Sequence, residues 1–218
     1  MKAFGTDYDG VIINIEPQKA TAFGELLYKE WGISKEQASK FWIAKGGTSR
    51  RYKFDHFFEE KFSKKLPVEI YNIIESKYSD LLKSEFYPKI KLLSGALNLL
   101  KFARSHFDFT FVSSGAPTKE IEYLINLKGV SDYFDLILGT DDHFRSKTDH
   151  FIEVIQKQKP DLIVFVADSP EDMKVAKDTK AIAIGVLTNH TKPELLNAGA
   201  KYVCEIKDAT GLLRTIVM

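Results

Sequence analysis

From Leu92 onward, short apolar runs alternate with amphipathic helical segments, and no other feature of the sequence constrains the fold as strongly. This alternation is typical of βαβ units, in which helices cover both faces of a parallel sheet. The pattern predicts strands at 107–112, 136–138, 162–167 and 181–187. The apolar run at 2–6 is expected to be the first strand of the same sheet, so the fold class is expected to be α/β.

Residues 15–87 lack this alternation and are expected to form only helices. Phe23, Leu27 and Trp31 recur at every fourth residue, which places their side chains on one face of a helix. Further aromatic side chains are interpreted as the core of a helical bundle rather than as ligand-stacking groups. They are Trp42, Phe54, Phe57, Phe58 and Phe62. The predicted domains are therefore a core at 1–14 and 88–218 and a helical insertion at 15–87.

The composition is that of a globular protein that can bury a core. Of the 218 residues, 44% are hydrophobic and 28% are charged, which excludes a disordered or fibrous chain. The 31 Lys and Arg residues nearly balance the 30 Asp and Glu residues, so the net charge is +1. No general positive field attracts nucleic acid or an anionic membrane, and an anionic ligand must therefore be held by local groups.

A cytoplasmic location is expected from three features. The apolar runs fall short of the roughly 20 residues that span a bilayer. The segment from Met1 to Asp7 lacks the apolar core of a signal peptide. Cys204 is the one cysteine, so the sequence predicts no internal disulfide and no cysteine-rich zinc site, and we interpret it as a small core residue.

Acidic side chains follow two of the predicted strands, at the point where each strand ends. Asp7 and Asp9 follow the first strand, and Asp168 and Asp172 follow the strand at 162–167. The carboxyl ends of parallel strands meet at the edge of the sheet where ligands bind. A single Asp in such a place is usually the N-cap of the next helix, but four together indicate a shared site.

Four converging carboxylates require a cation, because their mutual repulsion in a partly desolvated cleft is severe. Mg²⁺ typically binds one or two carboxylates, keeps water ligands and bridges to substrate phosphate. Groups suited to phosphate also occur, namely the Ser113 hydroxyl, the backbone amides of Ser114 and Gly115, and the cation of Lys147. The sequence therefore predicts a magnesium site for phosphoryl transfer.

These residues resemble the four motifs of the haloacid dehalogenase-like hydrolase superfamily, in order and at compatible spacing. The motifs are Asp7-Tyr8-Asp9-Gly10-Val11, Ser113, Lys147 and Asp168-Ser169-Pro170-Glu171-Asp172. The helical insertion is similar to the cap of the subgroup that contains phosphoglycolate phosphatases and β-phosphoglucomutases. The resemblance covers nearly the whole core and implies a Rossmann-like parallel sheet with an inserted α-helical cap and bound Mg²⁺.

The resemblance also implies roles for the acidic residues. Asp7 would be the nucleophile that forms an aspartyl-phosphate. Asp9 would protonate the leaving oxygen and later activate water, and its backbone carbonyl would be a metal ligand. Asp168 would be a further metal ligand, and Asp172 would hold metal-bound water or orient Lys147.

Ser113 and Lys147 would bind the transferring phosphoryl oxygens. Taken alone, Ser113 could simply cap the following helix, and Lys147 could be a solvated lysine with Arg145 as the competing cation. Lys147 lies in the polar stretch before a helix expected near Thr148, which is where the family places its lysine.

Some positions depart from the family pattern. Thr148 stands where a proline usually follows the lysine, Ala167 stands in place of a common glycine, and Tyr8 stands in place of a smaller apolar residue. None of these departures removes a reacting group, but they leave the subfamily of the chain undetermined.

In the insertion, residues 46–51 resemble the substrate loop of capped members, and Arg50 and Arg51 are predicted to set specificity. The alternative is a helix-ending turn with solvated arginines.

The favoured function is a Mg²⁺-dependent phosphatase that acts on a small phosphorylated metabolite. A phosphomutase of the β-phosphoglucomutase type shares the core residues and is the alternative enzyme. From another class, a receiver-like signalling module also carries a phosphorylatable Asp on a parallel sheet, but it would be shorter and uncapped. We expect no nucleic-acid or membrane partner, and a monomer or homodimer.

Overall fold

The computed structural model describes residues 1–45, 49–140 and 143–217, and it divides into two compact units. The first unit, the core, comprises Met1–Asn14 and Lys91–Met218. The second unit, the lobe, comprises Ile15–Ile90. The second boundary therefore falls after Ile90, whereas the sequence pattern placed it three residues earlier, before residue 88.

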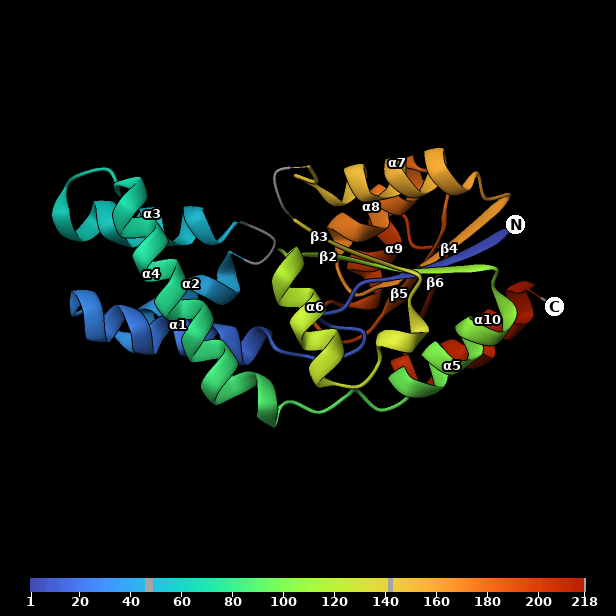
Figure 1. The fold of residues 1–218 in the computed structure, drawn as a ribbon, viewed down its shortest axis with the longest axis horizontal. Helices are drawn as coiled ribbons and strands as arrows, with labels where there is room; N and C mark the ends of the chain where they lie inside the picture. The colour runs from blue at the N-terminus through green and yellow to red at the C-terminus, as the bar shows by residue number, and fades with distance from the viewer. Residues whose placement is uncertain (46–48, 141–142, 218) are drawn as a thin grey trace. The chain divides into compact units, whose positions relative to one another are not determined.

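The core is built on a six-stranded sheet in the order β3-β2-β1-β4-β5-β6, with every neighbouring pair parallel (Figure 1). The strands are β1 (Lys2–Thr6), β2 (Phe109–Pro117), β3 (Leu136–Thr140), β4 (Leu162–Ala167), β5 (Ile182–Val186) and β6 (Tyr202–Cys204). The expected α/β fold with a parallel sheet is confirmed. The sequence pattern missed β6, because a strand of three half-buried residues is too short to show a period.

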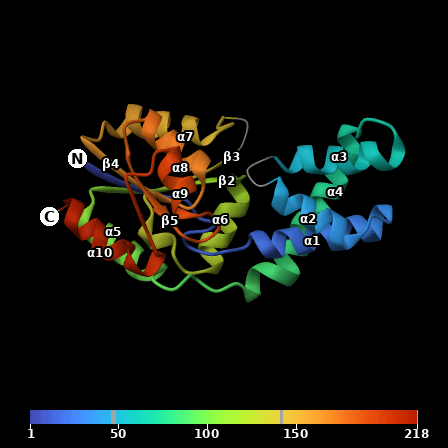
Figure 2. The ribbon, with the colours of Figure 1, turned by 180° about the vertical axis from the view of Figure 1, so that it is seen from behind.

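Helices cover both faces of this sheet. Helices α7, α8 and α9 lie on one face and α5, α6 and α10 on the other (Figure 1; Figure 2). Their bounds are α5 (Ala96–His106), α6 (Thr118–Leu127), α7 (Lys147–Gln158), α8 (Pro170–Asp178), α9 (Lys192–Ala198) and α10 (Ala209–Val217), with short turns η3 (Ser131–Tyr133) and η4 (Ile206–Asp208). Among the described residues, none of the helices is both long and apolar enough to cross a membrane.

The order in which successive strands are added to the sheet reverses at β1, which lies between β2 and β4. Connections from β2 proceed to one side of the sheet and those from β4 to the other. Such a reversal opens a crevice at the carboxyl ends of the adjacent strands, and in open α/β sheets this is where ligands bind. The topology therefore points to the end of β1.

An aromatic cluster packs against the middle of the sheet. Phe111 on β2 is fully buried, and its ring contacts those of Phe151 on α7 and Phe165 on β4, with centroids 5.7 and 6.2 Å apart. Gly5 on β1 lies against the same ring, and a Cβ at this position would come within 2.3 Å of the Phe111 Cζ. The sheet interior therefore requires a residue without a side chain at position 5.

The lobe is a helical bundle with an aromatic centre. Its helices are α1 (Glu16–Trp31), α2 (Lys35–Ala44), α3 (Arg50–Phe62) and α4 (Val68–Leu81), followed by a π-helical turn η1 (Leu82–Phe86) and a 3₁₀ turn η2 (Tyr87–Lys89). The Phe23 ring contacts those of Trp42 and Phe54 at 5.0 Å, and all three are buried. Phe62 differs from the expectation, because it ends α3 and is 42% exposed.

Cys204 lies half-buried on β6 rather than deep in the core. Burial, with smaller effects from Asp208 and Glu205, raises the pKa of its thiol to about 11. The group therefore stays protonated at neutral pH, which disfavours reactivity as a nucleophile.

We expect Gly5→Ala to lower the free energy of unfolding by about 1–3 kcal/mol, because the new methyl group overlaps a Phe111 ring that its neighbours hold in place. Chemical denaturation of the two proteins measures the difference.

Gly211→Ala is the matched control, because nothing lies within 4 Å of a Cβ at that position in α10. Alanine favours a helix over glycine by up to about 1 kcal/mol, so this variant should be as stable as the wild type or more so. Equal destabilisation by both substitutions would contradict the packing argument.

Candidate active site

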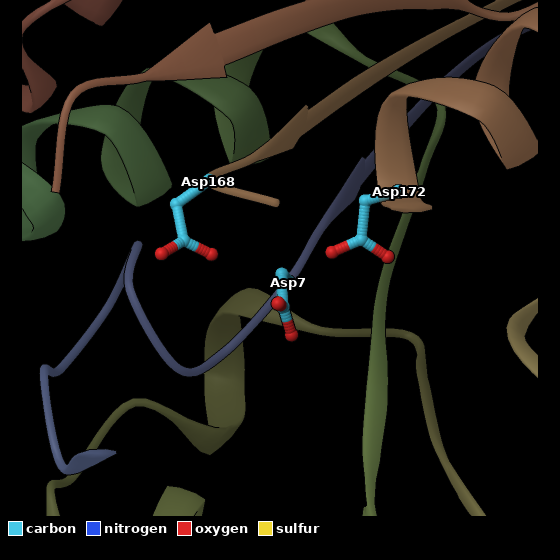
Figure 3. Close-up of side chains that lie close together, drawn as sticks. All are labelled: Asp7, Asp168 and Asp172. Atoms are coloured by element: carbon cyan, nitrogen blue, oxygen red, sulfur yellow. The ribbon is translucent and has the colours of Figure 1, made fainter. Parts of the chain in front are cut away.

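Three buried carboxylates converge at the carboxyl edge of the sheet. Asp7 follows β1, Asp168 follows β4, and Asp172 lies in the first turn of α8. One carboxylate oxygen from each lies within 4.8 Å of the others. Figure 3 shows the three side chains pointing into a common space. The structure thus brings together three of the four acidic residues that the sequence indicated.

Strand register accounts for the first two positions. In the β1–β4 pair, Thr6 lies opposite Val166, and the ladder is extended by the Asp7 amide, which donates to the Val166 carbonyl at 2.9 Å. The residues that follow the two strands, Asp7 and Asp168, are therefore delivered to the same edge. The Asp7 Oδ1 atom also accepts from the Tyr8 amide at 2.7 Å, which restrains the carboxylate.

The start of α8 sets the third position. Ser169 is the N-cap, and its hydroxyl accepts from the Asp172 amide at 3.2 Å and donates to Asp172 Oδ2 at 2.8 Å. Pro170 at the first helical position suits a helix start. Asp172 is favoured here because a carboxylate stabilises the positive end of the helix dipole.

Lys147 is the cation of this cluster. Its Nζ lies 2.7 Å from Asp172 Oδ1 and 3.0 Å from Asp7 Oδ2. The residue begins α7 instead of lying in the preceding loop, because Ser146 and Asp149 form a capping box that starts the helix one residue earlier than expected. Arg145, the competing cation, is exposed, and its backbone amide donates to Asp149.

Charges and burial shift the titration of these groups. Burial raises the pKa of Asp7 well above its usual range, although the ammonium of Lys147 opposes this. Burial raises the pKa of Asp168 to about 7, against a hydrogen bond from Asn189 and with added repulsion from Asp9. For Lys147, burial is outweighed by the two carboxylates, which raise its pKa. The Lys147 ammonium therefore faces three acidic groups that are costly to ionise together.

This excess of carboxylate over cation fits a divalent metal ion with oxygen ligands. Asp7 and Asp168 would hold such an ion, because the Lys147 ammonium contacts both carboxylate oxygens of Asp172 but only Oδ2 of Asp7. Asp9 is half-buried, and its carboxylate lies outside the close group of three. As a ligand, Asp9 could contribute its backbone carbonyl, as the sequence resemblance implies.

Sequence reasoning missed the residues that hold the loop after β1 in place. The Asn189 amide donates to Asp168 Oδ2 at 2.7 Å, and the Thr188 hydroxyl donates to the Gly10 carbonyl at 2.6 Å. Gly10 has a φ of +79°, and a Cβ there would lie 2.2 Å from the Asp168 carboxylate. The signal was present, since Thr188 and Asn189 are polar residues that follow a strand, as the acidic residues do.

The predicted phosphate-binding segment lies within the second half of β2, because this strand continues to Pro117 instead of ending at residue 112 as the sequence pattern predicted. Ser113 and Ser114 are buried, Gly115 is exposed, and open space surrounds the position of a Cβ at Gly115. The Ser114 hydroxyl accepts from the Ala116 amide at 3.2 Å. The Ser113 hydroxyl is 2.8 Å from Nδ1 of His150, a buried residue that sequence reasoning did not select.

The two predicted specificity residues contact other parts of the lobe. The Arg50 guanidinium lies 3.0 Å from Glu75 and stands over the Tyr78 ring. The Arg51 guanidinium pairs with Asp55 at 2.8 Å and also donates to the Leu66 carbonyl. Residues 46–48 of the predicted substrate loop, and Asp141 and Asp142 of the stretch before Lys147, lie outside the described residues.

Known structures share this fold. A predicted phosphoglycolate phosphatase from Haemophilus somnus is 15% identical, with a TM-score of 0.81 and 98% of each chain covered. A proposed β-phosphoglucomutase from Thermotoga maritima is 19% identical, with a TM-score of 0.76, covering 99% of this chain and 100% of the other. A predicted phosphatase from Clostridium acetobutylicum is 19% identical, with a TM-score of 0.77 and 98% of each chain covered.

Identities this low show a common fold, and a comparison with curated proteins found no match. The sequence itself matches a family model over residues 6–186, a span that runs from the end of β1 to the end of β5. That span includes all three clustered carboxylates and Lys147. The chain therefore belongs to the haloacid dehalogenase-like hydrolases.

Proposed function

We propose that this hydrolase is a Mg²⁺-dependent phosphatase that acts on a small phosphorylated metabolite through an aspartyl-phosphate. The observation that carries the proposal is the ammonium of Lys147 between Asp7 and Asp172, with Asp168 beside them. A buried carboxylate next to a fixed cation suits a nucleophile that must receive a phosphoryl group and then release it.

In the first step, an oxygen of Asp7 attacks phosphorus while the bond from phosphorus to the leaving oxygen breaks. Asp9 gives its proton to that oxygen, so the product leaves as an alcohol. In the second step, Asp9 removes a proton from water as the water attacks phosphorus. The bond to Asp7 breaks, phosphate is released, and both aspartates return to their first states.

Asp7, Asp168 and the backbone carbonyl of Asp9 would hold Mg²⁺, which would neutralise charge on the phosphate and the carboxylates when bound. Two roles were open for Asp172, holding metal-bound water or orienting Lys147. Its contacts with the Lys147 ammonium at 2.7 and 2.8 Å favour the orienting role.

The phosphoryl oxygens would be bound by Lys147, by Ser113, and by the amides of Ser114 and Gly115. The open space beside Gly115 supports this, because the backbone there can approach an anion without a side chain in the way. Lys147 would contribute most in the transition state, where negative charge builds next to Asp7.

Arg50 and Arg51 stay the proposed specificity residues. An arginine that contacts the leaving group would favour a leaving group with a carboxylate or a second phosphate, because the planar guanidinium can donate two parallel hydrogen bonds to either. The contact between Arg50 and Glu75 would hold the guanidinium in a defined orientation, so less conformational entropy would be lost when an anion binds.

A phosphomutase is the second candidate, and the similarity to the Thermotoga maritima protein is the observation that favours it. Both activities would use the same core residues and differ in how well the lobe keeps water from the aspartyl-phosphate. Release of inorganic phosphate in every turnover supports the phosphatase, whereas transfer to a second sugar phosphate supports the mutase.

We expect Asp7→Asn to lower kcat for an aryl phosphate by at least about 10³-fold, because an amide has nearly the same shape but is a poor nucleophile. Acid-quenched wild-type enzyme should carry one added phosphoryl group on the peptide that contains Asp7, as measured by mass spectrometry. Exposed Asp178→Asn is the control and should keep full activity. Substantial turnover by the Asp7 variant would exclude it as the nucleophile.

Substitution of Asp168 tests whether the site binds a metal ion. Because burial raises its pKa to about 7, the native state holds this proton more tightly than the unfolded chain, and stability from this group falls as the pH rises from about 4 to 7. At pH 8 without metal, Asp168→Asn should therefore raise the unfolding temperature, by about 2–8 °C for about 1–2 kcal/mol.

The same variant should lose the increase in unfolding temperature that Mg²⁺ produces in the wild type, and a chelator should abolish wild-type turnover. Asp178→Asn should respond to Mg²⁺ as the wild type does. An equal response of the Asp168 variant, or full turnover in excess chelator, would contradict the metal proposal.

Lys147→Ala should lower kcat by about 10²–10³-fold, because it removes an ordered charge that acts in the transition state. Arg145→Ala is the matched control, since this exposed cation lies two residues away. Steady-state kinetics on one aryl phosphate measure both variants. If Arg145→Ala proved the damaging change and Lys147→Ala stayed near wild type, the third motif would be misplaced.

A further inference from the structure

His150 is a fully buried histidine that connects three elements of the core. It lies on α7, and its Nδ1 is 2.8 Å from the Ser113 hydroxyl on β2. Its Nε2 is 3.0 Å from the Gly139 carbonyl on β3. The proposed mechanism does not use this side chain, yet Ser113, which is hydrogen-bonded to it, belongs to the predicted phosphate-binding segment.

Ser113 on β2 and Gly139 on β3, which are hydrogen-bonded to His150, lie on the two strands that flank a β-bulge. Ser113 pairs with Leu138, and the next pair is Pro117 with Thr140. Three residues of β2 therefore lie opposite Gly139 alone, and they include Ser114 and Gly115. The fit is close, because a Cβ on Gly139 would lie 2.5 Å from the backbone of Thr118 and 2.7 Å from the Ala116 carbonyl.

The partners also determine where the ring carries its proton. A carbonyl oxygen only accepts, so Nε2 must carry the hydrogen that it donates to Gly139. In the neutral ring, Nδ1 then has no hydrogen and accepts from the Ser113 hydroxyl. The direction of the Ser113 hydroxyl is therefore set by His150, and the imidazole joins both sides of the bulge.

His150 also lies three residues after Lys147, so both side chains occupy the same side of α7. We propose that His150 is a positioning residue that holds the bulge at 113–117 and the start of α7 in register. The phosphate-binding segment and the Lys147 ammonium are then placed by one buried side chain. This inference rests on the proposed phosphatase function.

Three variants separate the two hydrogen bonds. In His150→Asn the amide can reach the position of Nδ1 and offer Ser113 an acceptor, while in His150→Gln it can reach the position of Nε2 and offer Gly139 a donor. His150→Leu makes neither bond. The kcat and KM for an aryl phosphate, and inhibition by inorganic phosphate, are measured for each, with Mg²⁺ present.

We expect His150→Leu to lower kcat/KM by about 10–100-fold and to weaken inhibition by phosphate, because misplaced binding groups cost rate even when none is removed. His150→Asn should recover most of this loss, because it keeps the bond to Ser113. In the Ser113→Ala background, His150→Leu should cause little further loss, since the two residues act as a unit.

Phe151→Leu is the matched control, because Phe151 is the next residue on α7, is fully buried and makes only apolar contacts with Phe111 and Phe165. It should lower the unfolding temperature and leave kcat/KM within about threefold of the wild type. A merely structural role for His150 would give the same result for His150→Leu, and that outcome would overturn the proposal.

A spectroscopic measurement tests the role of His150 without relying on phosphatase activity. The ¹⁵N resonances of the His150 ring should show a protonated Nε2 and a bare Nδ1 at neutral pH, and Ser113→Ala should shift the Nδ1 resonance alone. A proton on Nδ1 with a bare Nε2 would overturn the inference. If the wild type hydrolysed no phosphate ester while the ring showed the expected state, the phosphatase proposal would fail and the positioning contact would stand.

Discussion

The rest of the site depends on the ammonium of Lys147 between the carboxylates of Asp7 and Asp172. A cation at the first residue of a helix is opposed by the helix dipole, and burial adds a further cost. The two carboxylates outweigh both effects and raise the pKa of the lysine. This ion pair therefore joins α7 to β1 and α8, and within the described part of the chain Asp168 forms no ion pair.

Asp168 is supported instead by the close approach of a backbone segment and by a hydrogen bond from the side-chain amide of Asn189. Gly10 approaches it so closely that no side chain fits there, and the Asn189 amide donates to its carboxylate. This arrangement holds the group in place but does not neutralise it, as the raised pKa shows. A carboxylate placed so firmly in a position that disfavours its charge is typical of a functional group, because a purely structural residue would be replaced by an amide without loss.

The segment at 113–115, for which we propose phosphate binding, depends on a different kind of support. Its bulge is opposed by a single glycine, Gly139, and the His150 ring is hydrogen-bonded both to Ser113 and to the Gly139 carbonyl. Backbone amides in such a bulge can turn toward an anion only if the surrounding packing keeps the chain from relaxing into a regular ladder. The bulge, the ion pair at Lys147 and the register of β1 with β4 thus act on one edge of the sheet.

The sequence by itself determined the α/β class, five of the strands and the convergence of Asp7, Asp168 and Asp172 at one edge of the sheet, because periodicity and strand ends are local patterns. Lys147 was found only through the order of the family motifs. The tertiary structure decided which side chains meet. The contacts of His150 with β2 and of Arg50 with Glu75 join residues 37 and 25 positions apart, and no local pattern encodes such a pairing. Only the packing of strands and helices brings such distant groups close enough to form hydrogen bonds in the interior, where an unpaired polar group is costly.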